Sequence, residues 1–114
     1  MFKFEKLEVW KKSVGLYEKV SEVADSIEQK EQFSLGEQIR RAALSISTNI
    51  AEGTGRERDK EHKYFFNIAK GSVYEVVSLL YVMKERGYLK TQNYEALYQQ
   101  CDEIARILSR LLSK

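Results

Sequence analysis

The chain has 114 residues, enough for one domain, and its net charge of +2 does not by itself indicate a nucleic-acid-binding protein. The composition, with no proline and 43% hydrophobic residues, is typical of a helical bundle and excludes a disordered chain. The single cysteine excludes an internal disulfide, and no apolar run approaches the ~20 residues that cross a bilayer. We therefore expect a cytoplasmic protein with one domain over residues 1–114.

The first predicted helix covers about residues 5–28. Its apolar residues recur at intervals of three, four and seven and form a broad buried face. Phe2 and Phe4 precede this helix, and we expect them either to fold back onto the bundle or to reach a neighbouring chain.

The second predicted helix begins at Ser34, because Ser34 and Glu37 have the spacing of a capping box. Gly53 and Gly55 predict its end, since glycine adopts left-handed backbone angles at little cost. Asn49 lies near this end, and we expect its amide to satisfy backbone groups at the turn that follows.

The third predicted helix runs from about Asp59 to residue 85 or 86, and Gly87 is expected to stop it. A glycine inside a helix costs ~1 kcal/mol relative to alanine, so Gly71 predicts a close approach of two backbones. Together with Ala69 and Ser72, it is expected to face a small-residue run in the second helix. That run consists of Ala42, Ala43, Ser45, Ser47 and Thr48.

The fourth predicted helix begins near Thr91, a candidate N-cap, and continues to the end of the chain. Short connections favour antiparallel neighbours, so the predicted fold is all-α, an antiparallel up-down-up-down four-helix bundle. Several helices carry more than one apolar stripe, which predicts that copies of the chain associate.

Catalytic and metal-binding patterns are missing from the sequence. His62 is the only histidine and has no metal-binding motif around it. Cys101 lies on an apolar stripe, which favours a buried structural thiol over a nucleophile. The run Gly53-Thr54-Gly55-Arg56 has neither the preceding strand nor the Lys-Ser/Thr ending of a phosphate-binding loop. We predict no enzyme activity, no catalytic residue, no cofactor and no metal.

Basic residues around the second and third helices are the candidate nucleic-acid-binding residues. They are Arg40, Arg41, Arg56, Arg58, Lys60 and Lys63. Two interpretations stay open: a track that contacts phosphates, or a solvated surface neutralised by nearby carboxylates. Glu52 has the spacing to pair with Arg56 on the same helix, and Arg41 is expected to bridge to another helix or subunit.

A protein-interaction module is the alternative function. Tyr88, Tyr94 and Tyr98 are its candidate anchors, because tyrosine is frequent in binding hot spots. The same tyrosines also suit a simpler role, in which they cover the end of the bundle.

Three stretches of the chain resemble a known family. QIRRAALSISTNIAEGTGR, FFNIAKGSVYEV and FEKLEVWKKSVGLYEKV are similar to the bacterial four-helix bundle proteins encoded in intervening sequences of large-subunit ribosomal RNA genes. The resemblance extends from Phe4 to Leu111. Where that family often has proline in its second helix, Ser47 stands here, which is expected to straighten the helix.

The resemblance implies a four-helix bundle that assembles into a homopentamer. It also implies kinship to the accessory variability proteins of diversity-generating retroelements, which are basic pentamers that bind nucleic acid and a reverse transcriptase. The expected partners are therefore further copies of the chain, RNA or DNA, and a protein such as a reverse transcriptase, and no membrane is expected. The family has no established enzymatic activity.

Overall fold

The computed structural model describes residues 1–114 and contains helices and no strands. The four helices are α1 Glu8–Asp25, α2 Glu37–Thr54, α3 Asp59–Glu85 and α4 Thr91–Leu112. A 3₁₀ turn, η1 (Lys3–Lys6), precedes α1, and the turns η2 (Gln29–Glu31) and η3 (Gln32–Gly36) connect α1 to α2. The prediction of an all-α fold with four helices is confirmed.

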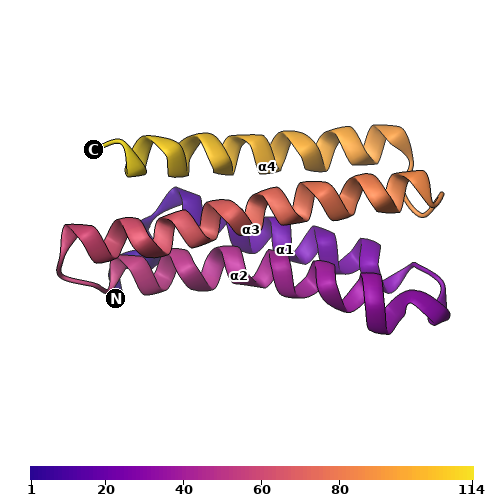
Figure 1. The fold of residues 1–114 in the computed structure, drawn as a ribbon, viewed down its shortest axis with the longest axis horizontal. Helices are drawn as coiled ribbons and strands as arrows, with labels where there is room; N and C mark the ends of the chain where they lie inside the picture. Colours follow the sequence, from indigo (N-terminus) through magenta and orange to yellow (C-terminus); the bar gives the residue numbers. More distant parts are fainter.

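The helices lie side by side along the 43 Å long axis of the molecule, and the two termini lie at the same end (Figure 1). Each helix contributes fully buried apolar side chains to one core, for example Leu16, Ile46, Leu80 and Leu108. Burial of a side chain of this size is worth about 1.5–3 kcal/mol. The spacing of apolar residues at intervals of three and four therefore determines which side of each helix packs into the core. No helix is both long and apolar enough to span a membrane.

The N-terminal segment folds back onto the bundle. Leu7 is extended, with φ −84° and ψ 123°, so η1 is separate from α1 and the first helix is shorter than predicted. The ring of Phe4 meets Trp10 edge-on at 4.8 Å, and Phe2 stacks on Phe4 at 5.9 Å. The turn η1 lies against both α1 and α2.

The start of α2 differs from the prediction. Ser34 does not cap the helix; its hydroxyl donates to the carbonyl of Glu31 at 3.4 Å. The turn η3 is π-helical, and the amide of Glu37 donates to the carbonyl of Gln32. The chain therefore enters α2 already coiled, and the predicted capping box is not needed to satisfy the amide of Glu37.

The end of α2 is where it was predicted, but for another reason. Gly55 follows the last helical residue with φ −80°, which is right-handed. Gly53 lies inside the helix, and a Cβ there would approach Cε1 of Phe66 to 2.8 Å. The predicted left-handed stop is therefore wrong, and Gly53 instead provides room for α3. Asn49 donates to Ser45 within α2, so its predicted role at the turn is also wrong.

The predicted contact between small residues is confirmed in part. The hydroxyls of Ser45 and Ser72 lie 2.9 Å apart between α2 and α3, and Ala69 is fully buried. Gly71 is exposed, and no atom lies within 4 Å of the position of its missing Cβ. Gly71 therefore does not face α2.

The limits of the last two helices agree closely with the sequence. Gly87 follows Arg86, the C-cap of α3, and has φ +82°, as a glycine stop requires. Thr91 is the first residue of α4 and not its N-cap, because Lys90 holds the cap position without a side-chain bond.

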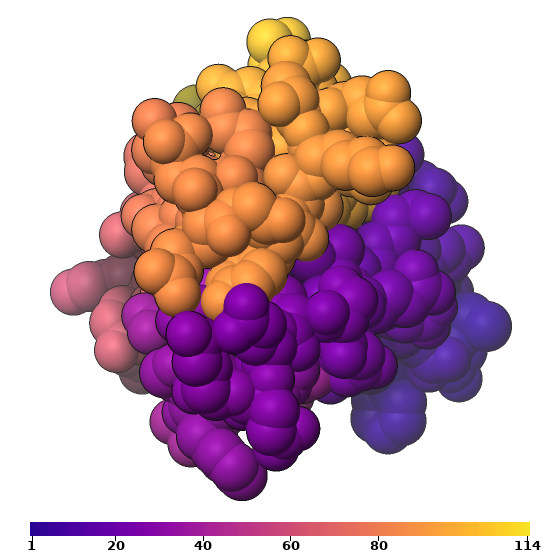
Figure 2. Space-filling view, turned by 90° about the vertical axis from the view of Figure 1, so that its right-hand side faces the viewer, coloured from indigo at the N-terminus to yellow at the C-terminus, as the bar shows by residue number.

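The α1–α2 connection and the α3–α4 turn meet at the end of the molecule opposite the termini (Figure 2). Glu31 accepts hydrogen bonds from Arg86, at 2.9 and 3.1 Å, and from the hydroxyl of Tyr88. The bond from Tyr88 and the charge of Arg86 hold the pKa of Glu31 below its ordinary value. Tyr88 therefore has a structural role, because it joins the two connections at this end of the bundle.

Candidate nucleic-acid interface

The structure divides the six predicted basic residues between the two ends of the molecule. Arg40 and Arg41 lie in the first two turns of α2, whereas the other four surround the connection from α2 to α3. With 18 residues, α2 is about 27 Å long. The six residues therefore do not form one continuous patch.

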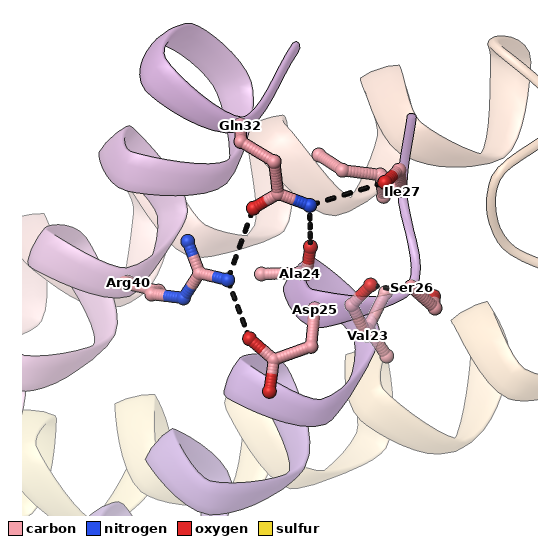
Figure 3. Close-up of polar contacts among 7 residues, drawn as sticks. All are labelled: Val23, Ala24, Asp25, Ser26, Ile27, Gln32 and Arg40. Carbon is pink, nitrogen blue, oxygen red and sulfur yellow. Dashed lines mark hydrogen bonds and ion pairs between the residues drawn. The ribbon is translucent and has the colours of Figure 1, made fainter. Parts of the chain in front are cut away.

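Arg40 has a structural role. Its guanidinium donates to Asp25 at 2.6 Å and to the side chain of Gln32 at 3.2 Å (Figure 3). The amide nitrogen of Gln32 donates in turn to the carbonyls of Ala24, at 2.9 Å, and Ile27, at 3.1 Å. Arg40 is half-buried in this network, which ties the end of α1 to η3 and α2. Its charge is already balanced by Asp25.

Arg41 points away from the bundle. Its side chain is 78% exposed and pairs with Glu37 of the same helix at 2.8 Å. It contacts no other helix through an ion pair, so the predicted bridge within the bundle is wrong.

The four residues of the α2–α3 connection differ in how far their charges are paired. Arg56 pairs with Glu52 at 2.6 Å, as predicted, and its guanidinium lies 4.8 Å from the centre of the Phe65 ring. Lys63 lies 3.4 Å from Asp59.

Arg58 and Lys60 are exposed, and neither forms an ion pair. Arg58 is the extended N-cap residue of α3, and its carbonyl accepts the amides of Glu61 and His62 at 3.0 Å. These two cations therefore stand at the positive end of a helix dipole.

The sequence analysis missed a further basic residue at this end. The turn η1 brings Lys3 to a shallow pocket that it borders with Thr54, the last residue of α2, and Gly55, which follows it. Lys3 is exposed and unpaired. About fifty residues separate Lys3 from Thr54 in the chain, so no local pattern predicts the contact. We name the group at this end, composed of Lys3, Arg56, Arg58, Lys60 and Lys63, the α2–α3 corner.

The reactive side chains lie apart from one another. Burial raises the pKa of the Cys101 thiol to about 12, which keeps it protonated at neutral pH. His62 lies 6.1 Å, ring centre to ring centre, from Phe66. No three His, Cys, Asp or Glu side chains are grouped closely enough to hold a metal ion.

One groove of the molecule is lined mostly by apolar side chains. It has a volume of about 310 Å³, lies between α3 and α4, and contains Asp102 as its only charged lining residue. Asp102 is bonded to Arg106 at 2.9 Å. The only carboxylate in the groove lining is therefore already paired with a cation, and the buried Cys101 thiol beside it is protonated.

Comparisons with known proteins give a family and a fold. The family model described as 23S rRNA-intervening sequence protein matches residues 5–110. A crystal structure of a protein with unknown function, from the S23 ribosomal protein family of Bacteroides thetaiotaomicron, has a TM-score of 0.86 and 21% identity. That match covers 93% of this chain and 99% of the other, and at this identity it shows the fold alone. No curated protein matches the chain.

Proposed function

We propose, from the premise that the chain belongs to the 23S rRNA-intervening sequence protein family, that it is a non-catalytic, self-associating bundle that contacts nucleic-acid phosphates through the α2–α3 corner. The observation that carries this proposal is the pair of unpaired cations, Arg58 and Lys60, at the N-terminus of α3. Unpaired cations gain most from phosphate, because they give up no internal partner.

The corner alone binds weakly. Arg56 and Lys63 already have carboxylate partners, and Glu57 and Glu61 are acidic neighbours of the two free cations. With two or three phosphates engaged per chain, the logarithm of the binding constant falls by about 2 to 3 per tenfold rise in salt. The contacts go to phosphates and do not read bases.

Assembly compensates for the weakness of one corner. The family resemblance favours an up-down-up-down bundle in a cytoplasmic homopentamer, which carries five corners. Exposed apolar side chains such as Leu44 and Ile68 support association, with 46% and 37% of their surface accessible. When several corners of one assembly bind the same nucleic acid, the overall affinity rises although each corner makes no additional contact.

The experiment is a double charge reversal, Arg58→Glu with Lys60→Glu. Gel retardation and fluorescence anisotropy with RNA and DNA duplexes, at about 50 and about 200 mM salt, should show binding by the wild type that weakens with salt. The double variant should lose about tenfold or more in affinity at the lower salt.

The matched control makes the same change of charge away from the corner. Lys19 and Lys90 are exposed and unpaired, so Lys19→Glu with Lys90→Glu should leave most of the binding intact. Equal losses in the two double variants would mean that only net charge matters, and the corner would be rejected as a site.

A protein-interaction module is the second candidate, favoured by an aromatic row on α3 and α4. The rings of Tyr81, Tyr94 and Tyr98 follow one another at 6.2 and 6.0 Å, and Lys84 lies 4.9 Å from the first two. Tyr81 is 49% and Tyr98 43% exposed, as suits anchors for a partner protein such as a reverse transcriptase. Salt-insensitive co-purification with one protein, abolished by Tyr81→Ala and Tyr98→Ala and unchanged by the corner variant, would establish this function.

A further inference from the structure

The outer face of α2 combines exposed apolar surface with a regular pattern of charge. Glu37, Arg41, Leu44, Thr48 and Glu52 recur at intervals of three and four, so they lie on one side of the helix. Leu44 and Thr48 are exposed in the middle of this side. We name these five residues, together with Arg56, which is bonded to Glu52, the α2 outer face.

Polar contacts within the chain flank this face. On the side of α3, Gln38 donates to Glu75 at 3.3 Å. On the side of α1, Arg40 is bonded to Asp25. From Glu37 to Glu52 the α2 outer face forms no polar contact with another helix, and only Arg56 at its end also lies over a ring of α3, that of Phe65.

The charges on the α2 outer face have a two-fold pattern. Each end carries a glutamate followed four residues later by an arginine: Glu37 with Arg41, and Glu52 with Arg56. Arg41 and Glu52 are equally distant from the midpoint between residues 46 and 47, and so are Glu37 and Arg56. An identical helix laid antiparallel across that midpoint places Arg41 opposite Glu52. Arg56 follows the end of α2, and its ion pair with Glu52 holds it on the side that faces Glu37 of the other helix.

We propose that the α2 outer face binds the same face of a second copy of this chain, antiparallel and related by a two-fold axis. Leu44 and Thr48 form the centre of the contact, and the two carboxylate-arginine groups at its ends set the register. Small side chains beside the axis, such as Ser45, let the two helices approach closely. This inference rests on the self-association in the proposed function and adds a two-fold contact to it, separate from the contacts that would close a ring of five chains.

The physical reason is electrostatic complementarity around an apolar centre. Each exposed pair within one helix is worth only about 0.3–0.5 kcal/mol, so little is lost when its members share charge with a second chain. Complementary charges at both ends select this register and disfavour others, while the apolar centre supplies the affinity. A contact in which both partners use the same surface closes at two chains, so it links two single chains or one chain from each of two larger assemblies.

The test uses two charge reversals that should each weaken association of the chain when made alone and restore it when the two variants are mixed. Arg41→Glu places two carboxylates opposite each other at both ends of the contact, and Glu52→Arg places two guanidiniums there. Each variant alone should associate about tenfold more weakly, or worse, in sedimentation velocity at micromolar concentration. In an equimolar mixture, the glutamate introduced at position 41 faces the arginine introduced at position 52, and association should return.

The double variant Arg41→Glu with Glu52→Arg adds a second test. It destroys both pairs within the helix, yet every contact between the two chains keeps opposite charges. It should therefore associate like the wild type. If the single variants weakened association only by destabilising α2, the double variant would associate even more weakly than they do. Circular dichroism of each variant verifies that the helices remain folded.

Arg106→Glu is the matched control. It breaks a comparable exposed pair four residues apart on α4, between Arg106 and Asp102, and should leave association unchanged.

Two results would overturn this contact even if the wild type associates. In the first, Arg41→Glu and Glu52→Arg each associate as strongly as the wild type. In the second, their equimolar mixture associates no more strongly than either variant alone. A wild type that stays monomeric would remove both this contact and the self-association in the proposed function. Nucleic-acid binding is measured separately with the Arg58 and Lys60 variants, and a chain that stays monomeric would bind only through one weak corner.

Discussion

Glycines show at the residue scale what a sequence conveys and what it does not. Gly53 looks like a helix stop, yet it is buried inside α2, because the rings of α3 occupy the space where its side chain would lie. Gly71 looks like a point of close contact, yet nothing lies near it. A glycine required for space cannot be distinguished from one required for backbone angle until its spatial neighbours are known, and here they come from another helix.

Substitution by alanine should change the stability of the chain in opposite directions at Gly71 and Gly53. Gly71→Ala should stabilise the chain by about 1 kcal/mol, the gain in helix propensity. Gly53→Ala has the same gain, but its Cβ would meet Cε1 of Phe66 at 2.8 Å and Cβ of Phe65 at 3.1 Å. Overpacking of this kind costs about 1–3 kcal/mol, so the net effect should be a loss.

Urea denaturation of both variants at one protein concentration measures the difference. Gly15→Ala is the control, since Gly15 also lies inside a helix with no atom within 4 Å of its Cβ position. It should behave like Gly71→Ala. Equal stabilisation by all three substitutions would show that α3 does not press on Gly53.

At the scale of elements, periodicity predicted the helices well and the connections poorly. The limits of α3 and the start of α4 follow from residues close in sequence, such as Gly87. The entry into α2 does not, because the π-helical turn depends on Gln32 reaching back to carbonyls at the end of α1. Gln32 also distinguishes two arginines that look equivalent in the sequence. Arg40 bonds to Gln32 and Asp25 within the fold, whereas Arg41 pairs only with Glu37 on the surface.

Arg40→Ala should therefore cost about 1 kcal/mol of stability, and Arg41→Ala less than about 0.5 kcal/mol. The first substitution removes two hydrogen bonds from a half-buried guanidinium, although Asp25 is largely exposed and weakens the effect. The second removes only an exposed pair. Denaturation midpoints below the concentration at which chains associate measure both, and hydrogen exchange in the first turn of α2 should quicken in the Arg40 variant alone. Similar losses in both would refute the structural role of Arg40.

At the scale of the whole molecule, the four-helix fold could be predicted because the apolar stripes of all four helices must share one core. The candidate site could not be assembled in the same way. It depends on which ends of the helices meet, and therefore Lys3 joins the α2–α3 corner while Arg40 leaves it. The opposite end of the molecule is closed by Glu31, Arg86 and Tyr88, which no sequence pattern links.

This closure predicts how stability depends on acid. The hydrogen bond from Tyr88 and the ion pair with Arg86 hold the pKa of Glu31 below its unfolded value of 4.5. A carboxyl group with a lowered pKa stabilises the folded state above its unfolded pKa and loses that contribution as the pH falls through its folded pKa. Glu31→Gln should accordingly be less stable than the wild type at neutral pH, and the difference should shrink below pH 4.5.

Urea midpoints of both proteins between pH 7 and pH 3 provide the measurement, with Glu28→Gln as the control. Glu28 is a neighbouring carboxylate whose only ion pair is with Lys30, at 3.4 Å on the same exposed connection, so its loss should change the acid dependence little. A constant difference between the wild type and Glu31→Gln across this range would mean that the carboxylate does not hold the two connections together. If the difference instead closes in acid, the two connections are joined through Glu31, and the end of the bundle opposite the α2–α3 corner is fixed by charge as well as by packing.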